Sequence, residues 1–153
     1  MSGPWTMTTA RYGDEHWNAI ARLRTDVFVV EQKVPVELEL DEWDRRVEHL
    51  AAYENGELVG TLRLVDKDGT VKIGRVAVRA DRRGTGVGRA MMQWALRRAR
   101  ERGFAAALVE SQIQVRGFYE KLGFVRRGGT FLDAGIPHVR LFLDFPSHDG
   151  GLP

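Results

Sequence analysis

Three glycines stand at alternate positions between an apolar, strand-like run and a helical pattern. Glycine has no Cβ, so its backbone can approach a ligand closely. The first turn of a helix carries unpaired N–H groups and the positive end of the helix dipole, which together favour an anion. The segment therefore predicts a phosphate-binding site. It is called the glycine loop below and consists of Arg83, Gly84, Thr85, Gly86, Val87 and Gly88, with Arg82 and Arg89 beside it.

The spacing of the glycine loop excludes two common phosphate sites. A P-loop ends in Gly-Lys-Ser/Thr, whereas Gly88 is followed by Arg89. A dinucleotide-binding fingerprint has two residues between its second and third glycines, whereas one residue separates Gly86 from Gly88. That fingerprint also lies early in a βαβ unit, whereas this loop follows a meander of antiparallel strands. A glycine-rich connection without any ligand stays open as the alternative.

Hydrophobic periodicity and turn residues predict the elements around the loop. Asn55-Gly56 and Asp68-Gly69 predict hairpin turns, so three antiparallel strands precede the loop. We expect strands over residues 6–12, 47–53, 57–65, 71–78, 104–109, 124–127 and 138–145, and helices over 14–30, 86–102 and 112–122. This order predicts an α/β (α+β) fold with a mixed sheet.

Length and composition narrow the class of protein. The 153 residues suit a single domain, 1–153, with a frayed tail over 146–153. There is no cysteine, which excludes disulfides, thiolate nucleophiles and cysteine-bound zinc, and we expect no metal. No apolar run approaches the roughly 20 residues of a membrane span, and the start lacks a signal-peptide pattern, so we expect a cytoplasmic protein without membrane partners.

The basic residues are unusual in kind. Only four of the 23 Lys and Arg residues are lysines, and the net charge is +2. The arginines mostly lie among acids rather than in a stripe interleaved with aromatic residues, which disfavours nucleic acid as a partner.

The glycine loop resembles the Arg/Gln-x-x-Gly-x-Gly/Ala motif of the GNAT superfamily, the Gcn5-related N-acetyltransferases, which follows a strand and opens a long helix. The resemblance implies a mostly antiparallel sheet flanked by helices and acetyl-CoA as the cosubstrate. It implies that the loop binds the pyrophosphate of coenzyme A and that the strand residues Val76, Ala77 and Val78 hydrogen-bond the pantetheine arm.

A second match lies in the segment 118–124, Phe-Tyr-Glu-Lys-Leu-Gly-Phe. In GNAT proteins a tyrosine at the position of Tyr119 commonly protonates the departing thiolate, a role that suits a phenol because it keeps its proton at neutral pH. Helical spacing places Gln112, Arg116 and Tyr119 on one face. The resemblance implies that Gln112 contacts pantetheine, with a surface glutamine as the alternative, and Arg116 is expected at a CoA phosphate or in solvent.

The chain also resembles the ElaA-type branch of this superfamily over residues 20–144. The likeness departs at one place, where relatives often have His-Ala-Gln and this chain has Glu110, Ser111 and Gln112. The residues that carry the likeness are Arg22, Arg24, Val27, Phe28, Glu31, Gln32, Val34, Pro35, Glu39, Asp41, Glu42, Asp44, His49, Gly135, Ile136, Pro137 and His138.

Acetyl transfer needs a neutral amine, so a carboxylate or histidine must take its proton. Glu110 is the candidate base, and His49 is the alternative. For His49 and His138, the other interpretation is a purely structural role. The six acids between Glu37 and Glu48 are interpreted as a solvated loop paired with arginines such as Arg45 and Arg46, or as a patch that steers a cationic acceptor.

The predicted function is transfer of an acetyl group from acetyl-CoA to a primary amine, on a small molecule or a protein lysine, with a homodimer left open. The alternative is a non-catalytic sensor that binds CoA or acyl-CoA.

Overall fold

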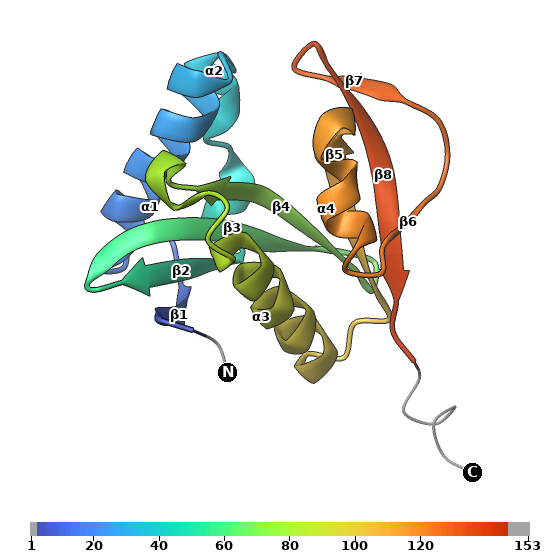
Figure 1. The fold of residues 1–153 in the computed structure, drawn as a ribbon, viewed down its shortest axis with the longest axis horizontal. Coiled ribbons are helices and arrows are strands. Elements are labelled where there is room, and N and C mark those ends of the chain that lie inside the picture. The colour runs from blue at the N-terminus through green and yellow to red at the C-terminus, as the bar shows by residue number, and fades with distance from the viewer. Residues whose placement is uncertain (1–2, 147–153) are drawn as a thin grey trace. The chain divides into compact units, whose positions relative to one another are not determined.

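The computed structural model describes residues 3–146 (Figure 1), so most of the tail predicted over 146–153 lies outside the described residues. No described helix is both long and apolar enough to cross a membrane. The α-helices are α1 (Trp17–Arg24), α2 (Val36–Glu39), α3 (Val87–Glu101) and α4 (Arg116–Glu120). The strands are β1 (Trp5–Ala10), β2 (Glu48–Glu54), β3 (Glu57–Lys67), β4 (Thr70–Val78), β5 (Ala106–Gln112), β6 (Val125–Arg126), β7 (Phe131–Asp133) and β8 (Ile136–Asp144).

The eight strands form one sheet in the order β1-β2-β3-β4-β5-β8-β6, with β7 also paired to β8. The β4–β5 ladder is parallel, whereas β1–β2, β2–β3, β5–β8, β6–β8 and β7–β8 are antiparallel. The predicted mixed, mostly antiparallel sheet flanked by helices is confirmed. By backbone contacts the chain forms two compact units, Met1–Val65 with Gly74–Leu96, and Asp66–Ile73 with Arg97–Pro153.

The first unit buries both faces of its strands. On one face, Ile20 and Trp17 of α1 pack against Ala51 of β2. On the other face, Met91 of α3 lies so close to Gly60 that a side chain at Gly60 would displace it. Because Ala51 and Gly60 belong to successive cross-strand pairs, they point to opposite faces of the sheet.

In the second unit, β5 pairs along its full length with β8, from Ala106 opposite Asp144 to Gln112 opposite His138. Helix α4 packs against β8 (Figure 1). A Cβ at Gly123, which follows α4, would lie 3.4 Å from Leu143 of β8. Leu143 pairs with Ala107, so α4 ends over the face that Ala107 presents.

Most predicted elements are confirmed with small shifts, and both hairpin turns adopt positive φ at Asn55-Gly56 and Asp68-Gly69. Three features differ, besides the boundary between β5 and α4 that is described with the site. The expected helix 14–30 is α1 followed by a π-helix, Thr25–Glu31. Helix α2 and strand β7 were not predicted. The described residues also form short 3₁₀ segments at Glu42–Arg45, Ala80–Arg82 and Ile113–Val115.

Candidate active site

The glycine loop joins β4 to α3 with an exposed backbone. Gly84 and Gly86 have φ of +79° and +98°, a left-handed conformation that strains any residue with a Cβ. A Cβ at Gly84 would meet no atom within 4 Å, and one at Gly86 would meet only the Trp5 ring at 3.5 Å. Two glycines are therefore needed for the backbone path, and the space above them is open.

The start of α3 supplies the donors that an anion needs. The first hydrogen bond of the helix runs from the Ala90 N–H to the Gly86 carbonyl at 3.1 Å. The N–H groups of Val87, Gly88 and Arg89 therefore precede the helix's own ladder. The helix is 15 residues long, so its dipole adds to the attraction for a negative group. These residues fit a pyrophosphate.

The side chain of Arg83 is already engaged. Its Nη1 and Nη2 each lie 2.8 Å from a carboxylate oxygen of Glu31, and its Nε donates to the Val78 carbonyl at 3.1 Å. The hydrogen bond from Arg83 lowers the pKa of Glu31. Arg83 thus ties the loop to the end of β4 and to the π-helix.

Strand β4 is paired with β5 over only its first residues. Its ladder with β5 covers Thr70–Lys72, and Val76, Ala77 and Val78 lie beyond that ladder. Between the two stretches, Arg75 has φ of +49° inside a strand, a conformation that a non-glycine residue holds only when its surroundings fix it. The Ala77 side chain is buried against Leu23 and Val27.

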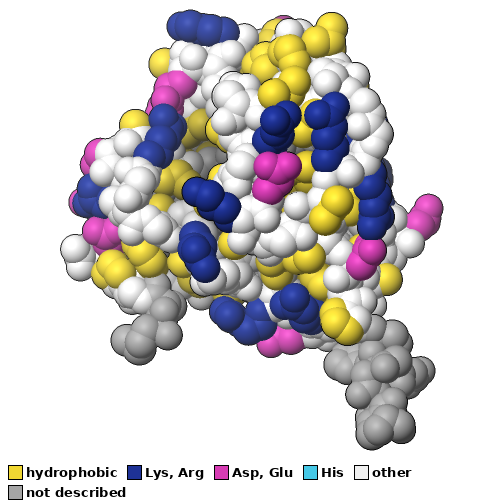
Figure 2. Space-filling model, turned by 45° about the vertical axis from the view of Figure 1, so that its right-hand side comes forward, with side chains coloured by type: hydrophobic (Ala, Val, Ile, Leu, Met, Phe, Trp, Pro, Cys, Tyr) yellow, Lys and Arg dark blue, Asp and Glu magenta, His cyan; other side chains and the backbone are white. Residues whose placement is uncertain are grey.

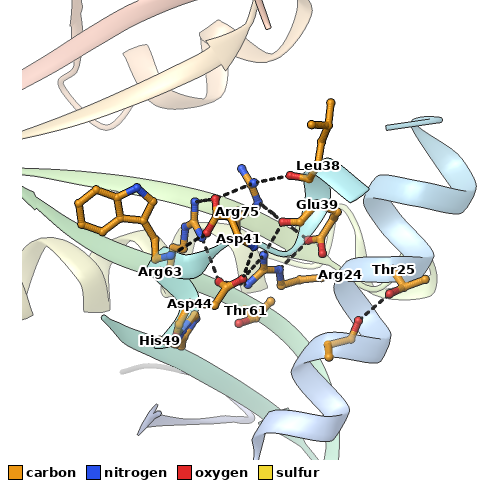
Figure 3. A network of polar contacts seen from close by, with 12 residues as sticks. Arg24, Thr25, Leu38, Glu39, Asp41, Asp44, His49, Thr61, Arg63 and Arg75 are labelled. Carbon is orange, nitrogen blue, oxygen red and sulfur yellow. Dashed lines mark hydrogen bonds and ion pairs between the residues drawn. The ribbon is translucent and has the colours of Figure 1, made fainter. Parts of the chain in front are cut away.

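A network of buried ions fixes Arg75 (Figure 3). The Arg75 guanidinium donates to the carbonyls of Leu38 and Glu39 at 3.2 and 3.1 Å and to Asp41 Oδ2 at 3.3 Å. Arg63 donates to both oxygens of the same Asp41 carboxylate, at 2.7 and 3.0 Å. The carbonyls come from α2 and its C-terminal end, so this short helix is held against the unusual turn in β4.

The network is centred on Arg24, which is completely buried. Its Nε lies 2.7 Å from Glu39 Oε1 and its Nη1 lies 2.6 Å from Asp44 Oδ1. Asp44 also accepts from Arg63 at 2.9 Å and from the Asp41 N–H at 3.1 Å. Burial acts to raise the pKa of Asp44, but these hydrogen bonds and charges outweigh it, so the pKa lies below its ordinary value.

The network corrects the interpretation of the acids 37–48 as a solvated loop. Glu39, Asp44 and Glu48 are buried, and the cations that hold Glu39 and Asp44 come from α1, β3 and β4. Glu37 is exposed, and Glu42 is exposed and lies 3.9 Å from Arg46, as that interpretation expected.

Tyr119 lies in α4 of the second unit and is buried, with Phe118 and Phe124 packed edge-on at 5.0 and 6.0 Å between ring centroids. Burial raises the pKa of Tyr119 to about 12. The phenol is therefore protonated at any physiological pH. Its hydroxyl has no hydrogen-bond partner among the described residues, so it keeps a proton to donate.

The structure does not place Gln112, Arg116 and Tyr119 on one helix face. Gln112 is the last residue of β5, and a 3₁₀ turn separates it from α4, which begins at Arg116. The expected spacing of one continuous helix is wrong at this point. Gln112 is half-buried and accepts a hydrogen bond from Gln114 at 2.7 Å, while Arg116 is exposed.

The two candidate bases are both constrained. Glu110 lies 2.7 Å from Lys72 Nζ and 3.0 Å from Arg140 Nε, and these cations outweigh burial and lower its pKa. His49 is 1% exposed, and its Nε2 donates to the Asp44 carbonyl at 3.0 Å. Burial lowers the pKa of His49, and its Nδ1 is buried without a partner. Their assignment as bases stays a prediction, and these contacts weigh against both.

The sequence model of the Acetyltransferase (GNAT) family matches residues 17–124, which span α1 to α4. The chain belongs to the GNAT family. YjcF of Bacillus subtilis, an uncharacterized N-acetyltransferase, is 38% identical over 123 residues, which cover 80% of this chain and 88% of YjcF.

Solved GNAT structures agree with this assignment. An acyl-CoA N-acyltransferase from Pseudomonas aeruginosa is 33% identical, with a TM-score of 0.82 over 90% of this chain and 98% of its own. ElaA of Escherichia coli is 26% identical, with a TM-score of 0.80 over the same shares. The family and these names support acyl transfer as the general activity.

The GNAT chain carries its charges in a mixed pattern. On the face in Figure 2, Lys and Arg side chains form small separate groups, several of them beside acids.

Asp14, Glu15 and His16 form a group of possible metal ligands before α1, with ligand atoms within 4.8 Å of one another. The Asp14 carboxylate already accepts from the Arg11 and His16 N–H groups.

Proposed function

We propose that this protein transfers an acetyl group from acetyl-CoA to a primary amine by direct attack of the amine on the thioester. The observation that carries the proposal is the open backbone of the glycine loop at the start of α3. Val76, Ala77 and Val78 supply hydrogen-bonding backbone for the pantetheine arm, since they lie beyond the β4–β5 ladder. The acceptor is a small-molecule amine or a protein lysine, and we place the reaction in the cytoplasm.

Tyr119 acts on the leaving group in this proposal. The amine forms a bond to the carbonyl carbon, the carbon–sulfur bond breaks, and the sulfur leaves as a thiolate. A thiol has a pKa of about 8.5, so its thiolate is a weaker base than a phenolate whose conjugate acid has a pKa of about 12. Tyr119 therefore stabilises the developing thiolate mainly by donating a hydrogen bond, and the thiolate takes its proton fully only as it leaves.

Release of free CoA across a panel of amines tests the activity. Tyr119→Phe removes the donor and keeps the ring that packs on Phe124. A hydrogen bond to a charged group contributes about 1.5–3 kcal/mol, so kcat should fall roughly 10- to 100-fold. The affinity for acetyl-CoA, measured by calorimetry, should change less than about twofold, because the hydroxyl acts on the transition state.

Tyr12→Phe is the matched control, because Tyr12 is exposed in the first unit and plays no part in the proposed reaction. An unchanged kcat in Tyr119→Phe, with chemistry limiting, would remove Tyr119 from the mechanism. Tight acetyl-CoA binding without turnover of any amine would favour the sensor module instead.

A further inference from the structure

The attacking amine must lose a proton, and the two predicted acceptors are poorly suited to take it. The Glu110 carboxylate is held between Lys72 and Arg140 at 2.7 and 3.0 Å. A carboxylate stabilised by two cations is a weak base. His49 is sealed beside the buried ions, with one ring nitrogen already donating to a carbonyl.

His138 presents a free basic nitrogen. Its Nδ1 lies 2.7 Å from the Ile136 carbonyl oxygen. A carbonyl only accepts, so Nδ1 carries the proton and, in the neutral ring, Nε2 carries the lone pair. No described residue hydrogen-bonds Nε2. His138 is only 8% exposed, but Nε2 is not one of the fully buried atoms without a partner, so part of this atom's surface is accessible. The His138 side chain is otherwise fixed by the Phe131 ring, 5.8 Å away between centroids.

The register of the sheet places His138 on a defined face. His138 lies opposite Gln112, and Arg140 lies opposite Glu110, so these four side chains share one face of the β5–β8 pair. Helix α4 ends over the other face, where a Cβ at Gly123 would lie 3.4 Å from Leu143. His138 therefore lies on the face of this strand pair that the end of α4 does not cover.

We propose that Nε2 of His138 is the general base that accepts the proton of the attacking amine, directly or through one water. The inference rests on the proposed acetyl transfer and adds a residue to it. As the amine nitrogen bonds to the carbonyl carbon, its proton moves to Nε2. The carbon–sulfur bond then breaks, Tyr119 donates to the sulfur, and His138 returns its proton to solvent.

The charges around His138 come from three strands. Glu110 on β5 and Arg140 on β8 lie on the same face, and Glu110 is paired with both Arg140 and Lys72. On β7, Asp133 lies opposite Ile136. The nearest cross-strand partner of His138 on β5 is the neutral Gln112.

His138→Asn is the decisive variant, because the Asn amide can still donate to the Ile136 carbonyl while nothing replaces Nε2. With the amine that releases CoA fastest, kcat/KM at neutral pH should fall about 100-fold or more, within the range of general base catalysis. If His138 is the base, the wild-type rate should fall on the acid side of the pH profile, and the variant should lack this acid limb. Acetyl-CoA affinity should stay within error of wild type.

Two further measurements separate catalysis from structure. Added imidazole should partly restore turnover in His138→Ala, and His16→Asn, in the first unit, should behave as wild type. A kcat/KM in His138→Asn within twofold of wild type, with the acid limb intact, would overturn the base while leaving acetyl transfer standing. If the wild type turns over no amine, the proposed function fails first. In that case ¹⁵N NMR spectra of the imidazole still test the proposal, because they report which ring nitrogen of neutral His138 carries the proton. A proton on Nε2 instead of Nδ1 would overturn the assignment of Nε2 as the base.

Discussion

Replacing Asp44 by Asn removes one charge from the buried network without changing the size of the side chain. Asp44 is 1% exposed and accepts hydrogen bonds from Arg24 at 2.6 and 3.2 Å and from Arg63 at 2.9 Å. The amide nitrogen of Asn would face guanidinium N–H groups, so donor meets donor. The network of three arginines and three carboxylates would also keep an uncompensated positive charge.

The expected loss follows from these contacts. Breaking a buried pair by removing one partner destabilises a protein by about 3–5 kcal/mol. For a chain of this size each kcal/mol lowers the melting temperature by roughly 2–4 °C, so Asp44→Asn should melt about 6–20 °C below wild type. Urea unfolding at pH 7 measures the free energy directly. The matched control is Glu42→Gln, the same charge change on the exposed acid that pairs with Arg46, which should lose less than about 1 kcal/mol.

The pH dependence gives a second check with a defined sign. The pKa values of Asp41 and Asp44 are lowered below the ordinary 3.8 in the folded protein. Their contribution is therefore fully present above about pH 4 and is lost as pH falls through the lowered folded values. The difference between wild type and Asp44→Asn should narrow below pH 4. Equal stability of Asp44→Asn and Glu42→Gln at pH 7 would refute the view that these ions are buried and coupled.

Two predictions concern the glycine loop. Gly86→Glu should weaken acetyl-CoA binding at least about 100-fold by calorimetry, because it strains a backbone at φ +98° and brings a negative charge to the anion site; wild-type affinity would mean that the pyrophosphate binds elsewhere. Glu31→Gln should tighten acetyl-CoA binding about threefold at low salt and less at high salt, because it frees Arg83 from a neutralising partner. Weaker binding in Glu31→Gln would instead show that the pair holds the loop in shape.

The parts of the fold that could be predicted are those fixed by local chemistry. Asn55-Gly56 and Asp68-Gly69 adopt positive φ because Asn, Asp and Gly tolerate this conformation better than other residues. The two tight turns that result make the strands on either side of them antiparallel. Gly103 ends α3 with φ of +83° for the same reason. The glycine loop was predictable because its conformation and its role depend on the same few residues.

The buried network could not be predicted, because it joins residues that are distant in sequence. Arg24 contacts Glu39 and Asp44 across 15 and 20 positions, and Arg63 reaches Asp41 from 22 positions away. Charged residues are mostly exposed, so a run of acids suggests solvent. One local signal was available: Arg24 lies on the helical stripe that contains Ile20, whose other members are apolar.

The boundary after β5 was missed for a different reason. The residues from Ser111 to Tyr119 contain no glycine or proline before Gly117, so no turn signal marks the change from strand to helix. The sequence therefore predicts a helical position for Gln112, although this residue pairs with His138 in the sheet. The same error hid the proximity of Gln112 and His138, which only the register of β8 provides.

The network is better understood as a device for position than for stability. Apolar residues that fill the same volume often stabilise a fold as well as a buried ion pair does, so buried charges alone are weak evidence of a stabilising role. Here the outermost cation, Arg75, is itself the strand residue with φ of +49°, one position before Val76, and its guanidinium is hydrogen-bonded to Glu39 of α2. Directional hydrogen bonds to the carbonyls of α2 can hold such a conformation, whereas apolar contacts cannot specify it. Of the charged residues that carry the ElaA-type resemblance, Arg24, Glu39, Asp41 and Asp44 belong to this network, and Arg75 connects the network to Val76 in the strand that we propose binds the cofactor.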